Sequence, residues 1–197
     1  DLDNDWGYQP RGQGMIGDTV WLDTNGNGVQ NTGESGQPNV TVNLYHDADG
    51  DGVIDAATDP LVATTTTLGY SVIDGYIDVS GNGTIGAEDA LTNLYGYSVI
   101  AGALDIDGST TIGATDDGYL GPYRVIDGRL DMNNDGSATT ADDGDLKGFY
   151  LFQNLPAANF IVQVAPAELT TGGDLAGLVM TNTDSAYNAS QTSRAVA

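Results

Sequence analysis

The stretch MIGDTVWLDTNGNGVQNTGE, residues 15–34, joins two patterns that usually belong to different folds. Residues 15–22 are rich in β-branched and aromatic side chains, which predicts a β-strand. Residues 23–34 match the calcium loop D-x-[DN]-x-[DN]-G-x5-E at every fixed position. In EF-hand proteins that loop joins two helices, whereas here it follows a strand. The sequence therefore predicts a β protein that binds cations at its turns.

The outer parts of the chain carry further strand patterns separated by turn residues. In residues 39–47 the apolar Val40, Val42 and Leu44 alternate with polar neighbours, which is typical of a half-buried strand. The other runs of strand composition are residues 60–67, 148–156, 159–166 and 175–183. Short strands with frequent turns predict a mainly β fold of the sandwich type.

The middle of the chain contains three repeats, which begin at Tyr70, Tyr97 and Tyr123 and are spaced by 97 − 70 = 27 and 123 − 97 = 26 residues. Each has an apolar start, a glycine turn, an Asp-rich loop and residues that favour a short helix. A unit this small needs neighbours to bury a core, and the regular spacing favours a calcium-bound solenoid. We therefore expect an N-terminal strand or linker (1–13), a sandwich (14–67 and 148–197) and an inserted three-repeat calcium-binding subdomain (68–147).

Five loops offer oxygen ligands at the positions that calcium coordination requires, namely 1, 3, 5, 7 and 12. In the second loop Thr58 stands at position 12, so Asp55 and Asp59 are expected to help. In the second repeat Thr110 replaces the turn glycine, and this loop, Asp105–Asp116, fits the pattern least well. The candidate ligands are Asp23, Asn25, Asn27, Val29 and Glu34; Asp47, Asp49, Asp51, Val53, Asp55 and Asp59; Asp78, Ser80, Asn82, Thr84 and Asp89; Asp105, Asp107, Ser109, Thr111 and Asp116; and Asp131, Asn133, Asp135, Ser137 and Asp142.

The charge balance supports the same interpretation. The chain has 28 acidic and 5 basic residues and a formal charge of −23. Repulsion between concentrated carboxylates weakens a compact state. Five Ca²⁺ ions would reduce the charge to −23 + 10 = −13. Hard oxygen ligands without cysteine favour calcium over zinc or copper. So acidic a chain is not expected to bind nucleic acid, and no apolar run predicts insertion into a membrane.

The flanking segments IGDTVWLDTNGNGVQNTGESGQPNVTVNLY, PLVATTTT and YLFQNLPAANFIVQV resemble the B-type repeats of bacterial serine–aspartate surface adhesins, the SdrD B-like domains related to collagen-adhesin B-type domains. The resemblance covers residues 14–67 and 148–183. It implies a prealbumin-like, Ig-like sandwich in an extracellular stalk of tandem modules that calcium stiffens. It also implies calcium roles for the loops that begin at Asp23 and Asp47. The loops of residues 68–147 resemble dockerin-type calcium repeats.

The N-terminal DLDNDWGYQP resembles the strand that closes the preceding domain in tandem arrays of that family. Residues 1–8 are therefore expected to complete the sandwich of a neighbouring copy by strand donation. The alternatives are one repeat of a long covalent chain and a strand that folds back on its own sandwich.

No phosphate loop, nucleophile elbow or zinc signature is present, and the lone His46 lies at a strand end, so we do not expect an enzyme. The predicted function is a calcium-stabilised stalk or filament module at the cell surface that contacts further copies of itself. The alternative is an adhesin whose insert recognises a glycan or a host protein.

Overall fold

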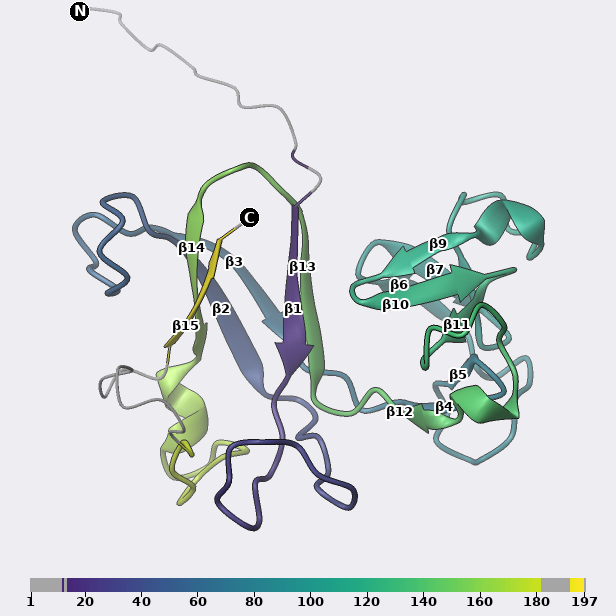
Figure 1. Cartoon of the computed structure of the whole chain (residues 1–197), viewed down its shortest axis with the longest axis horizontal. Helices are drawn as coiled ribbons and strands as arrows, with labels where there is room; N and C mark the ends of the chain where they lie inside the picture. The colour runs from purple at the N-terminus through teal and green to yellow at the C-terminus, as the bar shows by residue number, and fades with distance from the viewer. Residues whose placement is uncertain (1–11, 13, 182–191, 197) are drawn as a thin grey trace, which may run out of the picture.

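The computed structural model describes residue 12, residues 14–181 and the backbone of residues 192–196. The described chain is mainly β and contains several sheets. The flanking segments form one group of strands, and the central segment, residues 68–147, lies beside them (Figure 1).

The flanking segments form two antiparallel sheets. In the smaller sheet, β1 (Gly14–Thr19) pairs with β13 (Phe149–Leu155). The larger sheet has the order β15-β14-β2-β3. Its strands are β2 (Thr41–His46), β3 (Leu61–Thr66), β14 (Asn159–Val164) and β15 (Thr192–Val196). A short 3₁₀ turn, η3 (Pro166–Leu169), follows β14.

One apolar core joins these two sheets. Val42 and Leu44 of β2 point into it together with Phe160 of β14, and Tyr150 and Phe152 of β13 pack against them from the smaller sheet. The predicted alternation in residues 39–47 is confirmed, because Val42 and Leu44 are almost fully buried. Two sheets that share one core in this way form a β-sandwich.

The central segment consists of three small sheets, one for each repeat. Their strands are β4 (Ser71–Ile73), β5 (Tyr76–Asp78), β6 (Leu91–Leu94), β7 (Tyr97–Ile100), β8 (Ala103–Asp105), β9 (Gly118–Leu120), β10 (Tyr123–Ile126), β11 (Arg129–Asp131) and β12 (Gly144–Asp145). In each sheet a strand that follows one acidic loop pairs with the hairpin of another repeat, in the orders β6-β7-β8, β9-β10-β11 and β12-β4-β5. Because β12 ends the third repeat and pairs with the first hairpin, the three repeats close into a ring.

The hairpins are made by two-residue turns in which both residues have positive φ. In the first repeat Asp74 and Gly75 have φ of 52° and 81°, and in the third Asp127 and Gly128 have 48° and 77°. The sequence Asp-Gly is the strongest signal for this turn type. In the second repeat Ala101 stands where the others have aspartate, at φ 46°.

Strand β13 belongs to both cores. Its alternate residues Tyr150 and Phe152 face the sandwich core, whereas Phe149 and Leu151 face the core of the central segment. The ring of Phe149 lies 5.6 Å from that of Tyr123. The Tyr95 hydroxyl donates to the Phe149 carbonyl at 3.1 Å. Burying one large apolar side chain contributes about 1.5–3 kcal/mol, so β13 couples the stability of the two parts.

Three sequence expectations differ from the structure. The strand expected over residues 175–183 is not formed in its described part. Residues 175–177 form a turn, in which Gly177 takes positive φ and Leu178 N–H donates to the Leu175 carbonyl, and residues 178–181 have no regular structure. Residues 182 and 183 lie outside the described residues. The final described strand is β15 instead. The short helices expected in the three repeats are single 3₁₀ turns in the second and third, η1 (Ala114–Asp116) and η2 (Thr140–Asp142), and a plain turn in the first. The prediction of a solenoid is wrong, because strand β12 of the third repeat pairs with strand β4 of the first and closes the repeats into a ring.

Candidate metal centres in five acidic loops

The first residue of each acidic loop is an aspartate that accepts hydrogen bonds from its own loop. In the first loop Asp23 accepts from the N–H groups of Gly26 and Gly28, both at 2.7 Å. In the first repeat Asp78 accepts from Gly81 at 2.7 Å and from Gly83 at 2.9 Å. These bonds curl the backbone around the carboxylate, so the later ligand positions turn towards it.

The side chains at position 5 repeat a second local contact. Asn27 accepts from the N–H of Val29 at 2.8 Å, and Asn82 accepts from Thr84 at 2.7 Å. Asp135 makes the same contact with Ser137 at 2.9 Å. Short polar side chains often stabilise turns in this way. Here they hold residue 7, whose backbone carbonyl is a ligand in calcium loops, beside the side chain at position 5.

The carboxylate that ends each loop is buried and ties the loop's start to its last turn. Glu34 accepts from Thr24 N–H and Asn31 N–H, each at 2.9 Å. Asp89 accepts from Ser80 N–H at 2.9 Å and Gly86 N–H at 2.8 Å. The corresponding Asp116 and Asp142 make the same contacts and are completely buried.

The second loop contains one extra residue, and Asp59 takes the closing position. Its carboxylate accepts from Ala48 N–H at 3.0 Å and from Asp55 N–H at 2.9 Å. The carboxylate of Asp55 instead accepts from the next turn, at Ala57 N–H, 2.9 Å away. Of the two residues expected to replace Thr58, Asp59 therefore lies at the site, and Asp55 contributes its backbone.

Two of the five loops bring three carboxylates together. Oxygens of Asp47, Asp49 and Asp59 lie within 4.8 Å of one another, and the same holds for Asp105, Asp107 and Asp116. Among the described residues, these are the clusters dense enough in acidic groups to hold a metal ion.

In each cluster the first aspartate has a buried oxygen with no hydrogen-bond partner. These atoms are Asp47 Oδ2 and Asp105 Oδ1, and both residues are at least 97% buried. An unpaired buried carboxylate oxygen is costly unless a cation or donor meets it. The donor set is all oxygen and carries three negative charges, so it fits Ca²⁺.

Hydrogen bonds keep several loop carboxylates ionised. The N–H of Asn31 lowers the pKa of Glu34, and the hydroxyls of Thr115 and Ser109 lower that of Asp107. Desolvation raises the pKa of Asp23, but the N–H of Gly28 and the hydroxyl of Thr181 lower it by more. Such carboxylates are anionic at neutral pH and need no deprotonation before they bind a cation.

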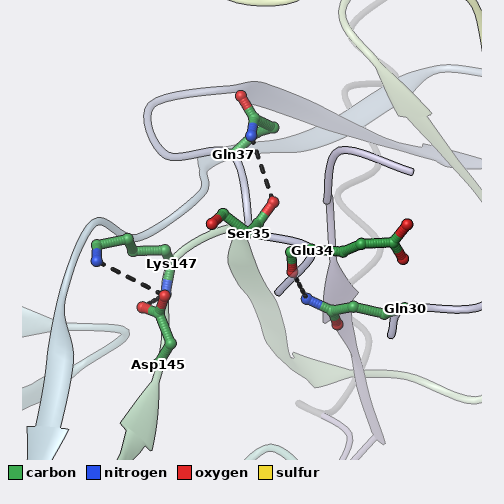
Figure 2. Close-up of polar contacts among 6 residues, drawn as sticks. All are labelled: Gln30, Glu34, Ser35, Gln37, Asp145 and Lys147. Carbon is green, nitrogen blue, oxygen red and sulfur yellow. Dashed lines mark hydrogen bonds and ion pairs between the residues drawn. The ribbon is translucent and has the colours of Figure 1, made fainter. Parts of the chain in front are cut away.

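The first loop lies against the point where the chain returns from the central segment (Figure 2). Gln30 Nε2 donates to the Glu34 carbonyl at 3.2 Å, and Val20 N–H donates to the Gly148 carbonyl at 2.9 Å. A side chain at Gly36 or Gly148 would collide with the backbone opposite it. The neighbouring Lys147–Asp145 ion pair, 3.6 Å, is substantially exposed and contributes little.

In the central ring, the turn glycine of one repeat holds the loop of the repeat before it. Gly102 N–H donates to the carbonyl of Asp89, which ends the first-repeat loop, at 2.7 Å. The carbonyl of Gly102 accepts from the N–H of Ile77, which directly precedes the same loop, at 2.7 Å. Gly128 makes the same two bonds to Asp116 and Leu104, at 3.3 and 2.7 Å.

The ring closes through the third turn glycine, since Leu130 N–H donates to the Gly75 carbonyl at 2.7 Å. A side chain at Gly75 or Gly128 would come within 2.8 Å of the carbonyl oxygen of Leu130 or Leu104, the residue whose N–H donates to that glycine. Sequence reasoning identified these glycines as turn residues only. Their hydrogen bonds to another repeat depend on ring closure, which has no local sequence signal.

Glu168 is a buried carboxylate that the sequence did not single out. Its oxygens accept from Thr41 N–H at 3.0 Å and Asp174 N–H at 3.2 Å, which anchors η3 to β2. The hydroxyl and the N–H of Thr41 lower its pKa. Among the described residues Glu168 belongs to neither cluster of three carboxylates, and its contacts make it a structural clamp.

The first two acidic loops lie in a part of the chain that matches a known protein family. Residues 14–71 match the SdrD B-like domain. The match includes the loops that begin at Asp23 and Asp47 and ends as the first repeat begins. SdrD B-like domains are structural modules of cell-surface adhesins. The three loops from Asp78 onward lie outside the SdrD B-like match.

No curated protein and no solved structure matches the chain. Within the described residues, no helix is long and apolar enough to cross a membrane.

The strain at Thr110 gives a test of the loop geometry. Thr110 has φ 65°, where the equivalent Gly83 and Gly136 have 79° and 92°. A β-branched residue in this region is strained by about 1–3 kcal/mol. We expect Thr110→Gly to raise the free energy of unfolding by about 1 kcal/mol, because the greater freedom of glycine in the unfolded chain offsets part of the gain.

Urea denaturation in excess chelator measures this backbone effect apart from any cation. The matched control is Gly83→Ala, which places a side chain at the equivalent position and should lower stability. An unchanged or lower unfolding free energy for Thr110→Gly would contradict the assignment of Thr110 to the glycine position of this loop.

Proposed function

We propose that the chain is an extracellular, calcium-stabilised structural module of a cell-surface stalk or filament. The observation that carries this proposal is the common construction of the five acidic loops. Each closes between an aspartate at its start and a buried carboxylate at its end, and two contain a buried oxygen without a partner. The SdrD B-like match supports the location and the structural role.

The residues of each loop would hold the ion in the way their positions indicate. The carboxylates at both ends, the side chains at positions 3 and 5 and the carbonyl at position 7 provide the ligands. A bound Ca²⁺ would supply two positive charges where the loop concentrates negative ones. The loop residues then fix strand ends and turns, which suits a mechanical element. The Ig-like topology that the family resemblance implies belongs to the same proposal.

Calcium removal tests this function directly. At a free concentration ten times the dissociation constant, each site that binds only the folded chain adds about 1.4 kcal/mol. For a chain of this size 1 kcal/mol corresponds to about 2–4 °C. With several sites filled, we expect circular dichroism melts in millimolar calcium to lie about 10 °C or more above those in chelator.

Two variants sharpen this experiment. Asp47→Asn removes a buried ligand charge and should reduce the calcium-dependent shift. Asp174→Asn removes an exposed charge outside the loops and should leave the shift unchanged. Equal melting temperatures of the unmodified chain in calcium and in chelator would contradict the proposed calcium function.

We also propose that copies assemble head to tail, with residues 1–8 adding a strand to a neighbouring copy. Residues 1–8 lie outside the described residues, so the support comes from the acceptor side. Among the described strands β1 pairs with β13 alone, which leaves its other edge to offer N–H and C=O groups. Such a repeated, heterologous contact gives an open filament.

Deletion of residues 1–8 tests the assembly. We expect the full chain to scatter light as an assembling species in millimolar calcium and the deleted chain to remain a single copy, because the added strand is lost. A mixture of residues 1–8 as a free peptide with the full chain should slow assembly by competition. Assembly that is unchanged by the deletion would contradict strand donation.

A further inference from the structure

We propose that the second-repeat loop, Asp105–Asp116, is the first of the three ring loops to bind a divalent cation, and that its filling is transmitted around the ring to the other two. This inference rests on the proposed calcium function and adds an order and a coupling to it. The sequence alone does not favour this loop, since Thr110 makes it the poorest match to the calcium pattern.

The first argument is the charge gathered in this loop. Asp105, Asp107 and Asp116 bring three carboxylates within 4.8 Å. The first-repeat loop has two carboxylates at its ligand positions, Asp78 and Asp89. The third-repeat loop also has three, Asp131, Asp135 and Asp142, but among the described residues these do not converge to within 4.8 Å. Ligand charge is one of the factors that set the affinity of a calcium loop, and the convergence of three carboxylates favours the second-repeat loop.

The second argument is the unpartnered oxygen at the start of the loop. Asp105 accepts one loop N–H, from Thr110 at 3.1 Å, and its Oδ1 is buried without a partner. Asp131 instead has both oxygens satisfied, by Asp135 N–H at 3.0 Å and Gly136 N–H at 2.9 Å. A cation at the second-repeat loop would therefore give Asp105 Oδ1 the partner that it lacks. In the third-repeat loop, backbone N–H groups already provide partners for both oxygens of Asp131.

The coupling runs through the turn glycines. Gly128 bonds to the carbonyl of Asp116 and to the N–H of Leu104, so it holds both ends of the second-repeat loop. From Gly128 the chain passes through β11 directly into Asp131, the first residue of the third-repeat loop. When the second-repeat loop closes, its bonds to Gly128 fix the third-repeat hairpin. That hairpin positions Asp131, the first proposed ligand of the third-repeat loop.

A side-chain tie strengthens two of the three junctions. The Asp117 carboxylate accepts from Asp127 N–H at 2.9 Å, and that of Asp143 accepts from Asp74 N–H at 2.7 Å. At the remaining junction Ala90 has no carboxylate to offer Ala101. The second-repeat loop is thus tied more firmly to the third than the first-repeat loop is to the second.

A calcium titration followed by amide nuclear magnetic resonance measures the filling order. The amides of Ser80, Ile106 and Asn133 donate to the closing carboxylates of the first-, second- and third-repeat loops. Ala48 does the same for the sandwich loop that ends at Asp59. We expect Ile106 to reach its midpoint at the lowest calcium concentration of the three ring amides, with Ser80 and Asn133 following.

The central variant is Asp107→Asn, which keeps an oxygen but removes one charge. We expect the Ile106 midpoint to rise on the order of tenfold and the Ser80 and Asn133 midpoints to rise with it. The matched control, Asp49→Asn, makes the same change in the sandwich loop. It should move the Ala48 midpoint and leave the three ring amides in place.

The variant Asp117→Ala tests the tie without touching a proposed ligand. The Ile106 midpoint should stay within about twofold of the unmodified chain, while that of Asn133 rises because the junction between the loops is weakened. The inference is overturned if Ser80 or Asn133 saturates first, or if Asp107→Asn moves Ile106 alone. If no amide responds to calcium, it is the proposed calcium function that fails.

Discussion

The structure depends on keeping buried carboxylates satisfied at the ends of its acidic loops. Five of these residues are almost fully buried, namely Asp78, Asp89, Asp105, Asp116 and Asp131. The protein interior penalises a buried polar or charged group that has no partner. Backbone N–H groups supply part of the compensation, which curls each loop tightly. The compensation is incomplete at Asp47 and Asp105, and the proposed function assigns its completion to a hard cation.

The loops also determine how the rest of the molecule is held together. In the ring, Gly102 and Gly128 each bond to both ends of another repeat's loop, and Gly75 accepts from Leu130 just before the third-repeat loop. We therefore expect the apolar core inside the ring to depend on closed loops. That core includes Phe149 and Leu151 of β13, whose neighbours Tyr150 and Phe152 belong to the sandwich. A change in the loops is therefore expected to reach the sandwich through one strand.

Sequence patterns predicted the parts of this fold that depend on local chemistry. The alternation of Val40, Val42 and Leu44 identified β2, and the glycine turn expected in each repeat is the turn of its hairpin. The repeat spacing located the three central loops. Ring closure was not predictable, because β12 consists of two residues, Gly144 and Asp145, without any strand pattern. Without a pattern that marks the closing strand, the periodic sequence does not distinguish a solenoid from a ring.

The positions of the acidic loops were predictable from the sequence, but which of their carboxylates converge was not. Counting positions ranked Asp105–Asp116 last, since Thr110 breaks the consensus. The structure shows that this loop gathers three carboxylates and leaves Asp105 Oδ1 unpaired. Similarly, the second loop has one extra residue, so spacing alone does not show that Asp59 closes this loop as Glu34 closes the first. Such features depend on which backbone donors reach each oxygen, and spacing alone does not reveal that.

The most direct test of the central claim is hydrogen–deuterium exchange in millimolar calcium and in chelator. It should follow the amides of Ile77, Leu104 and Leu130, which bond to the turn glycines of the ring. If closed loops hold the ring together, these amides exchange slowly in calcium and much faster after chelation, and the loss of protection extends to Phe149 and Leu151. Equal protection in both conditions would contradict the account, because the ring would then be held by its backbone and apolar core alone.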